Sequence, residues 1–570
     1  MPLRTTLRRL RSLESIVAQT ARRDLQRRRV RRLDAAVAAP GMIESVQFDA
    51  PALHRSRELP ARTVPLRSPR EHSQELIEQV QALLHGAGIP TADFLVHTAA
   101  DRTLGIRAEH WSRATELIAK NLDQVLVGTG ARRAGTALYS PHPAEEDVER
   151  SPIIYVLAPA VSRHRGRVVK RYGFETALRL HRWNYDAETG GYTAARWNPR
   201  AVQLSASAFR TTPLPPLGHG EPSSPAPVAG PAHIAGEDPL DPLAQTPLMA
   251  VDFPIDVVYT WVDGTDPQWI ARKRAAAEQN TGERMSEAAA ADLRFVAHDE
   301  LRHSLRSLEQ YAPWVRHIYL VTDRQRPEWL REDHPRITVV DHTEIAPEGS
   351  LLPSFNSQAI EANLHRIEGL SEHFIYFNDD VFLSSPIAPD LFFHPNGIAS
   401  MYLSKAHVGP GEPIQAEPAS DSAGKNARAL VREVSGRRVS RKLFHTPFAL
   451  QRSVSQEIEH RWPEVVQATR DSQFRRIDDI TLSGALHMNY AYATGRAVTH
   501  SIRYRYLNVG SAGAAKKLRR LHKDRDVLQT FCLNEATQEL PPEVIDQQVR
   551  DFLAHRFPDV SSFEKLDAAV

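Results

Sequence analysis

Strand-like and helix-like segments alternate along residues 255–380, and this alternation constrains the fold more than any other feature of the sequence. Strands separated by helices form βαβ units, in which the strands run parallel and the helices cover the sheet. We therefore predict an α/β domain with a largely parallel sheet and flanking helices. The predicted strands are Ile255–Trp261, His317–Val321, Ile337–Val340 and Phe374–Phe377. One predicted helix starts at Trp269, and two others cover His298–Tyr311 and Asn356–Ile367.

Three of the four predicted strands lead directly into aspartates, namely Asp263, Asp323 and the adjacent pair Asp379 and Asp380. In open α/β sheets, ligands bind beyond the carboxyl ends of the strands. A single acid in such a place usually starts a turn or caps a helix. A cluster of carboxylates there suits Mg²⁺ or Mn²⁺, which prefer oxygen ligands and bridge phosphate oxygens. The candidate metal ligands are Asp379 and Asp380. Because adjacent side chains can point in opposite directions, one of them can bind the metal while the other forms a hydrogen bond within the turn.

A proline-rich segment divides the chain, whose 570 residues are too many for one hydrophobic core. Residues 213–247 contain ten prolines among Gly, Ala and Ser, which predicts an extended linker over residues 213–250. Upstream, residues 72–212 predict a smaller α/β or α+β domain in which no motif points to chemistry. Downstream, residues 251–570 form the predicted catalytic domain.

The N-terminal segment, residues 1–45, is basic. Residues 1–33 carry eleven arginines against Glu14 and Asp24, with leucines at helical spacing, which predicts a basic amphipathic helix. Such a helix suits peripheral contact with an anionic membrane surface, although a solvated arginine-rich tail fits the composition equally well. No apolar run reaches the length of a membrane span, and the apolar core of a secretory signal is missing.

Charge and cysteine content narrow the class of protein further. The formal net charge of +2 creates no strong field for nucleic acid, so we predict no nucleic-acid partner. Cys532 is the only cysteine, which excludes an intramolecular disulfide and a cysteine-built zinc site. These features predict a cytoplasmic setting, at the inner face of the membrane if the basic helix binds there.

Four blocks of sequence after residue 250 follow one another in order. They are Ile255–Pro267; then Asp299–Arg302, Leu305–Ser307, Trp314, Val321–Asp323, Pro327–Trp329, Leu352–Ser357, Ala359–Glu361 and Phe374–Asp380; then His445–Pro447, Phe474–Arg475 and Asp478–Asp479; and then Phe531–Asn534, Phe557–Pro558 and Ser562–Glu564. Together they resemble the Stealth family, which includes bacterial capsular and exopolysaccharide phosphotransferases and the catalytic subunit of the animal GlcNAc-1-phosphotransferase. Three residues depart from the family pattern: Ser354 for Thr, His303 for Tyr, and Glu535 where Asp is frequent, which leaves the role of residue 535 open.

The resemblance implies transfer of a hexose-1-phosphate from a nucleotide-sugar such as UDP-GlcNAc to a glycan hydroxyl, with release of UMP. Such a reaction needs charge neutralisation, positioned reactants and a base. The implied catalytic residues are Asp380, Arg475, His445 as general base and Glu361 as an alternative base or acceptor ligand. The residues implied in nucleotide-sugar binding are Asp256, Trp261, Asp263, Gly264, Asn356 and Arg302.

Structural alternatives stay open for several of these residues. Trp261 packs either on the nucleotide base or in the core, and Arg475 binds either phosphate or a nearby aspartate, Asp478 or Asp479. Arg302 on a predicted helix is by default solvated. Residues 405–442, rich in Gly, Pro, Ser and charge, are interpreted as a mobile insertion over the acceptor or as a plain surface loop. A metal-dependent glycosyltransferase that releases UDP and a non-catalytic binding module are the alternative functions.

Overall fold

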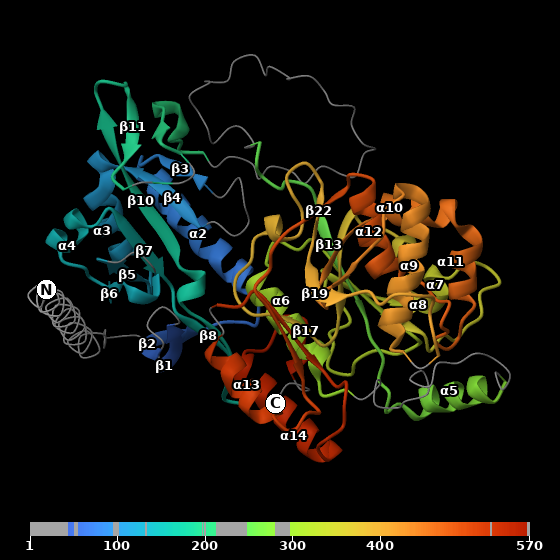
Figure 1. The fold of residues 1–570 in the computed structure, drawn as a ribbon. Coiled ribbons are helices and arrows are strands. Elements are labelled where there is room, and N and C mark those ends of the chain that lie inside the picture. The colour runs from blue at the N-terminus through green and yellow to red at the C-terminus, as the bar shows by residue number, and fades with distance from the viewer. Residues whose placement is uncertain are drawn as a thin grey trace, which may run out of the picture. The chain divides into compact units, whose positions relative to one another are not determined.

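The computed structural model describes residues 44–50, 55–94, 102–130, 134–196, 198, 201–212, 248–279, 297–415, 417–524 and 527–566. The predicted basic helix near the N-terminus and the linker at 213–247 lie outside these residues. The described chain forms two compact units, one before and one after that linker (Figure 1). Of the helices described, none has the length and hydropathy of a membrane span.

The first unit contains two sheets, with strand orders β1-β2-β8-β9 and β12-β11-β10-β7-β5-β6, and β3 and β4 joined to the second sheet through β10. Its elements are β1 (Glu44–Ala50), β2 (Arg55–Thr63), α2 (Pro69–Gly86), β3 (Thr91–Asp93), β4 (Thr103–Arg107), α3 (Trp111–Asn121), β5 (Leu126–Thr129), β6 (Leu138–Ser140), α4 (Glu145–Arg150), β7 (Ile153–Leu157), β8 (Ala160–His164), β9 (Arg167–Tyr172), β10 (Leu178–Asp186), β11 (Gly191–Ala194) and β12 (Gln203–Leu204). The predicted start at residue 72 is too late, because the strands β1 and β2 bury Val46, Phe48 and Leu59 in the core of this unit.

The second unit is built on a five-stranded sheet in the order β15-β14-β13-β16-β21. Its strands are β13 (Ile255–Thr260), β14 (Ile318–Thr322), β15 (Ile337–Asp341), β16 (His373–Asn378) and β21 (Phe448–Gln451). The first four run parallel and β21 is antiparallel to β16. Almost every residue of β13, β14 and β16 is buried, as expected for strands covered on both faces. The predicted α/β class with a largely parallel sheet is confirmed.

Smaller sheets extend this framework. They are β17-β24-β23, β18-β22 and β19-β20, formed by β17 (Val381–Leu383), β18 (Ala399–Met401), β19 (Leu403–His407), β20 (Arg441–Leu443), β22 (Ala497–Thr499), β23 (Tyr504–Asn508) and β24 (Thr530–Asn534). The flanking helices are α5 (Pro267–Gln279), α6 (Glu300–Tyr311), α7 (His342–Ile345), α8 (Ser357–Glu361), α9 (Ala419–Ser435), α10 (Arg452–Arg461), α11 (Pro463–Arg470), α12 (His487–Ala493), α13 (Ala514–Lys523) and α14 (Pro542–Arg556). Asp379 and Asp380 form the turn that leads from the main sheet into β17.

Two segments differ from their predictions. The helix predicted over Asn356–Ile367 is interrupted, with α8 ending at Glu361 and a short 3-10 turn following at Leu364–Arg366. Residues 405–442, interpreted as a mobile insertion or a plain surface loop, contain the helix α9 and end in the strands β19 and β20. The apolar side of α9, which includes Ala423, Ala427 and Leu430, is buried at helical spacing and holds the segment against the unit.

Candidate active site

A cavity of about 790 Å³ opens at the carboxyl ends of the parallel strands in the second unit. Thr260 at the end of β13 lies opposite Asn378 at the end of β16, so the segments that follow these two strands start side by side. One consequence is that Trp261 and the Asp379–Asp380 turn both line the cavity. This is the edge of the sheet at which ligands of open α/β folds bind.

Six of the residues predicted for the site line this cavity, although they come from widely separated parts of the chain. They are Trp261, Glu361, Asp379, Asp380, His445 and Arg475. The Nε2 atom of His445 lies 3.5 Å from the Oδ1 atom of Asp380. His445 follows β20, whereas Asp380 follows β16, so the main sheet and the two-stranded β19-β20 sheet together create this contact.

Asp380 is held from behind by the C-terminal strand β24. Its Oδ2 atom accepts hydrogen bonds from the Cys532 thiol and from Nδ2 of Asn534, both at 3.2 Å, and its peptide oxygen accepts from the Leu533 N–H at 3.0 Å. Burial favours a raised pKa for Asp380, but the His445 charge and these hydrogen bonds outweigh burial and hold the pKa below its usual range. Cys532 and Asn534 received no role from the sequence, although both lie in the block Phe531–Asn534.

The two neighbours of Asp380 titrate in ways that reflect its negative charge. Burial and then the charge of Asp380 raise the pKa of Asp379 to about 7. Burial alone lowers the pKa of His445, but Asp380 reverses this effect, with help from Glu361 and Asp379, and the pKa ends above its usual value. The arrangement therefore concentrates one ionised carboxylate and one imidazole at the centre of the cavity.

Glu361 provides a second carboxyl group in the cavity wall. Its Oε1 atom accepts a hydrogen bond from the Tyr376 hydroxyl at 3.4 Å, and that hydroxyl also lies 2.9 Å from Oγ1 of Thr260. Its Oε2 atom is buried and has no hydrogen-bond partner among the described residues. Burial raises the pKa of Glu361 to about 7, although the Arg475 charge and hydrogen bonds from Tyr376 and Ser357 oppose the shift.

Arg475 lies in the same wall as Glu361. One of its terminal nitrogens donates a hydrogen bond to Oγ of Ser357 at 2.6 Å, and within the described residues its Nε atom has no hydrogen-bond partner. Asp479, the alternative partner, instead accepts hydrogen bonds from Asn356 and from the Arg476 N–H. The guanidinium group therefore keeps donors that can bind a phosphate on the cavity side.

Asp256, predicted to bind the nucleotide-sugar, lies outside the cavity. It is fully buried near the start of β13, whereas the cavity lies beyond the end of this strand. Its carboxylate accepts hydrogen bonds from the guanidinium group of Arg316 and from the Ser371 N–H at 2.8 Å. Asp256 therefore joins the strand to neighbouring loops. Its role in nucleotide-sugar binding was implied by the family resemblance alone, because Asp256 stands near the start of the predicted strand Ile255–Trp261.

Asp263 and Gly264 form a turn next to the cavity and do not line it. The Asp263 carboxylate accepts hydrogen bonds from the Thr265 N–H at 2.9 Å and from its hydroxyl at 2.6 Å, and the Asp263 N–H donates to Gln325. These contacts are those of an aspartate that stabilises its own turn, the structural alternative for a single acid after a strand. Asp323, in contrast, lines the cavity and pairs with Arg272 at 3.0 Å.

Asn356 is fully buried behind the cavity wall. It caps α8 by accepting a hydrogen bond from the Gln358 N–H, and its Nδ2 atom donates to Asp479 at 2.7 Å and to the Ser472 carbonyl. The side chain of Asn356 thus caps α8 and bonds within the protein, whereas the sequence predicted that it contacts the nucleotide-sugar. Asn356 fixes the position of the helix that carries Ser357 and Glu361.

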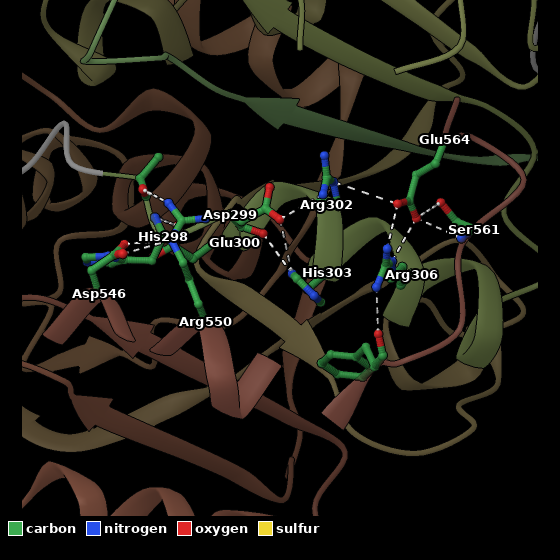
Figure 2. Close-up of polar contacts among 12 residues, drawn as sticks. His298, Asp299, Glu300, Arg302, His303, Arg306, Asp546, Arg550, Ser561 and Glu564 are labelled. Carbon is green, nitrogen blue, oxygen red and sulfur yellow. Dashed lines mark hydrogen bonds and ion pairs between the residues drawn. The ribbon is translucent and has the colours of Figure 1, made fainter. Parts of the chain in front are cut away.

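Arg302, the last of the predicted nucleotide-sugar residues, belongs to an ionic network on α6 (Figure 2). It pairs with Asp299 at 3.2 Å and lies 3.7 Å from Glu564, and its guanidinium group stacks over Trp329. Arg306, one turn further on, is buried and binds Glu564 through two nitrogens at 2.8 and 2.7 Å. Both arginines thus hold the C-terminal segment to α6, and neither lines the cavity.

Glu535, whose role the sequence left open, lies in the cavity wall directly after Asn534. Its Oε2 atom is 3.2 Å from Nε2 of the buried His298, and Nδ1 of His298 is 2.9 Å from Asp546 on α14 (Figure 2). His298 also lines the cavity. Sequence reasoning missed this residue because it precedes α6 without a recognisable motif.

The donor atoms at the centre of the cavity fit a divalent cation. The ligand atoms of Asp380, His445 and Cys532 lie within 4.8 Å of one another, and within the described residues no other set of three His, Cys, Asp or Glu residues is grouped in this way. Oδ2 of Asp380 is occupied by two hydrogen bonds, whereas Oδ1 faces His445. The oxygens of Asp380 and Asp379 suit Mg²⁺ or Mn²⁺, and an imidazole nitrogen as a further ligand favours a transition metal.

Three family models match the part of the chain that forms the second unit. The sequence matches Stealth protein CR1, conserved region 1, over residues 253–281, Stealth protein CR2, conserved region 2, over residues 294–401, and Stealth protein CR3, conserved region 3, over residues 444–492. The part of the chain after the linker belongs to the Stealth family. The Stealth regions contain β13, the Asp379–Asp380 turn, Glu361, His445 and Arg475. The family predicted from the sequence is confirmed.

Proteins from several bacteria match the same part of the chain. An exopolysaccharide phosphotransferase of Streptomyces coelicolor is 47% identical over 322 residues, which are 56% of this chain and 54% of that protein. The exopolysaccharide phosphotransferase CpsY of Mycobacterium tuberculosis is 37% identical over 322 residues, 56% of this chain and 60% of that protein. The chain thus spans little more than half the length of these relatives. The solved galactosyltransferase LgtC aligns with a TM-score of only 0.28 at 10% identity, over 55% of this chain and 100% of that one, which is too low to support an inference.

Proposed function

We propose that the second unit transfers a hexose-1-phosphate from a nucleotide-sugar of the UDP-GlcNAc type to a glycan hydroxyl, with release of UMP. The observation that carries this proposal is the meeting of Asp380, His445, Glu361 and Arg475 in one cavity. The names of the relatives support a phosphotransferase that acts on exopolysaccharide. In this reaction the acceptor oxygen attacks the sugar-bearing phosphorus, the new P–O bond forms, and the bond to the nucleotide phosphate breaks.

Each residue of the cavity has a proposed task. His445 takes the proton of the acceptor hydroxyl, and the Oδ1 atom of Asp380 at 3.5 Å orients its imidazole. Glu361 accepts a hydrogen bond from an acceptor hydroxyl through its unpartnered Oε2 atom and is the alternative base. Arg475, fixed by Ser357, binds a phosphate oxygen pair through its remaining donors. Trp261 in the cavity wall offers an aromatic face to the nucleotide base.

Mg²⁺ or Mn²⁺ is the proposed cofactor, held by Asp380 with Asp379. When bound, it neutralises negative charge on the donor diphosphate. The chain itself contributes the fixed geometry, because Cys532 and Asn534 hold Oδ2 of Asp380 in place.

The proposal is tested by incubating the protein with a panel of nucleotide-sugars, Mg²⁺ or Mn²⁺ and a glycan acceptor. We expect release of nucleoside monophosphate and retention of the donor's phosphorus in the product. Release of nucleoside diphosphate would instead identify a glycosyltransferase. If no nucleotide is released from any donor while the folded protein still binds glycan, the chain is a binding module and the proposal is wrong.

Replacing Arg475 with lysine is expected to lower kcat/KM for the nucleotide-sugar by roughly 10- to 100-fold. Lysine keeps the charge but loses the planar pair of donors that binds two phosphate oxygens. The measurement is steady-state kinetics at saturating acceptor. Arg476→Lys, one residue further on and outside the cavity, is the matched control and should retain activity. An unchanged kcat/KM in Arg475→Lys would exclude bidentate phosphate binding by Arg475.

A further inference from the structure

The helix α13 (Ala514–Lys523) divides sharply into an apolar and a cationic face. Ala514, Leu518 and Leu521 are buried in the core of the second unit. The exposed residues on the other side are Lys516, Lys517, Arg519, Arg520 and Lys523, and the helix contains no acidic residue. At about 100° per residue, these cations cover an arc of roughly 160° opposite the buried residues.

Three of these cations have no partner among the residues that the structure describes. Lys517 contacts the Ser511 hydroxyl at 3.3 Å, and Arg520 lies 3.8 Å from Asp524, which is already bound to Arg505 at 2.9 Å. For Lys516, Arg519 and Lys523 the structure gives no hydrogen bond or ion pair to any described residue, and the three fall within an arc of about 60°. The acidic residues that follow most closely in sequence are Asp524, which is bound to Arg505, and Asp526, which lies outside the described residues. Near the start of the helix, Glu539 accepts a hydrogen bond from the Ala512 N–H.

Repulsion between the positive charges on this face destabilises the helix. Lys516 and Arg519 are three residues apart and Arg519 and Lys523 four, and like charges at these spacings repel each other on a helix surface. No acidic side chain within the helix relieves this repulsion. A bound anion would relieve it, which favours a ligand over an inert solvated surface.

The cationic face is connected to the candidate active site through a short loop. The strand β23 (Tyr504–Asn508) and the residue after it carry Tyr506 and Val509, both of which line the cavity, and α13 starts five residues after Val509. The start of α13 is therefore tied to the cavity wall by a loop of four residues.

We propose that the cationic face of α13 binds the polyanionic part of the glycan acceptor and product, a polymer that carries phosphodiester groups. This inference rests on the proposed function, because each transfer of a sugar phosphate adds one negative charge to the glycan. Lys516, Arg519 and Lys523 bind successive phosphates and keep the growing chain near the cavity. A membrane surface is the less suitable partner, because the apolar residues of α13 are buried and leave nothing to insert between lipids.

The test measures binding by the full chain without turnover. Soluble poly(glycerol phosphate) is titrated at low and at high salt, with neutral dextran and phosphatidylglycerol–phosphatidylcholine vesicles as comparison ligands. We expect the wild type to bind the phosphate polymer with an affinity that falls with salt. The triple variant Lys516→Glu, Arg519→Glu, Lys523→Glu should bind about tenfold or more weakly. The matched control, Arg113→Glu, Lys120→Glu, Arg150→Glu in the first unit, changes the net charge equally and should bind as the wild type does.

The outcomes separate this inference from the proposed function. The α13 triple variant should release nucleoside monophosphate normally with a short uncharged acceptor, so loss of polymer binding alone supports the inference. Three results would overturn the inference. The control variant could bind the polymer as weakly as the α13 variant, the α13 variant could bind it as tightly as the wild type, or the wild type could bind vesicles only. If the protein binds the polymer through α13 but never releases nucleotide, the anion site is supported and the transferase proposal is contradicted.

Discussion

Replacing Asp380 with asparagine is expected to reduce nucleoside monophosphate release by about a thousandfold or more. The change removes the charge that faces His445 and the cation but keeps the size of the side chain. It also keeps an oxygen that can accept from Cys532 or Asn534, so the fold should survive. The measurement is kcat with the preferred nucleotide-sugar, together with the thermal unfolding midpoint of the variant.

Asp263→Asn provides the matched control for this prediction. It is chemically the same change at a strand end, but the Asp263 carboxylate bonds only within its own turn and does not line the cavity. An asparagine accepts the same hydrogen bonds, so activity should stay within about twofold of the wild type. Comparable loss in both variants would show that strand-end carboxylates act through stability, and normal activity in Asp380→Asn would remove Asp380 from the mechanism.

Replacing Glu361 with glutamine is expected to stabilise the protein at pH 8 while it lowers activity by roughly 10- to 100-fold. Burial raises the pKa of this carboxyl to about 7 from an ordinary value near 4.5. Between these two values the folded state binds a proton that the unfolded state has lost, so the free energy of unfolding falls as the pH rises through this window. The full difference corresponds to about 3 kcal/mol above pH 7.

The sign of this effect distinguishes Glu361 from a carboxylate that stabilises the fold. Glutamine resembles the protonated carboxyl, so the variant and the wild type should unfold with similar free energies near pH 4. The variant should become more stable by about 2–3 kcal/mol at pH 8. Urea unfolding at both pH values measures the difference, and other titrating groups cancel between the two proteins. A variant that is less stable than the wild type at pH 8 would mean that Arg475 and Tyr376 more than compensate for burial.

The sequence predicted the main sheet well because its signal is local. The strands β13, β14, β15 and β16 appear as short runs of β-branched and aromatic residues. The burial of β13, β14 and β16 on both faces follows from the alternation with helices, whereas β15 is a partly exposed edge strand. The helix α9 was missed because glycine, serine and charged residues mask its buried residues, such as Ala427 and Val431, which only tertiary packing reveals.

For the candidate site, the sequence predicted which segments meet but not the direction of each side chain. Asp256 lies near the start of β13 and Asp263 lies beyond its end, and neither residue lines the cavity. Asn356 and Arg302 carry suitable chemistry and use it for capping and for an ionic network. Cys532, Asn534 and His298 could not be predicted from local patterns, because their contacts with Asp380 or Glu535 join residues far apart in the chain.

The tie between Asp380 and β24 has a consequence for how the protein is made. During synthesis the main sheet and the loops bearing His445 and Arg475 leave the ribosome well before Thr530–Asn534, which form the strand that clamps Asp380. A nascent or truncated chain that ends before this strand can form the sheet but not the fixed carboxylate. Because β24 holds the Asp380 carboxylate, we expect a chain truncated before this strand to lack the transfer activity proposed above.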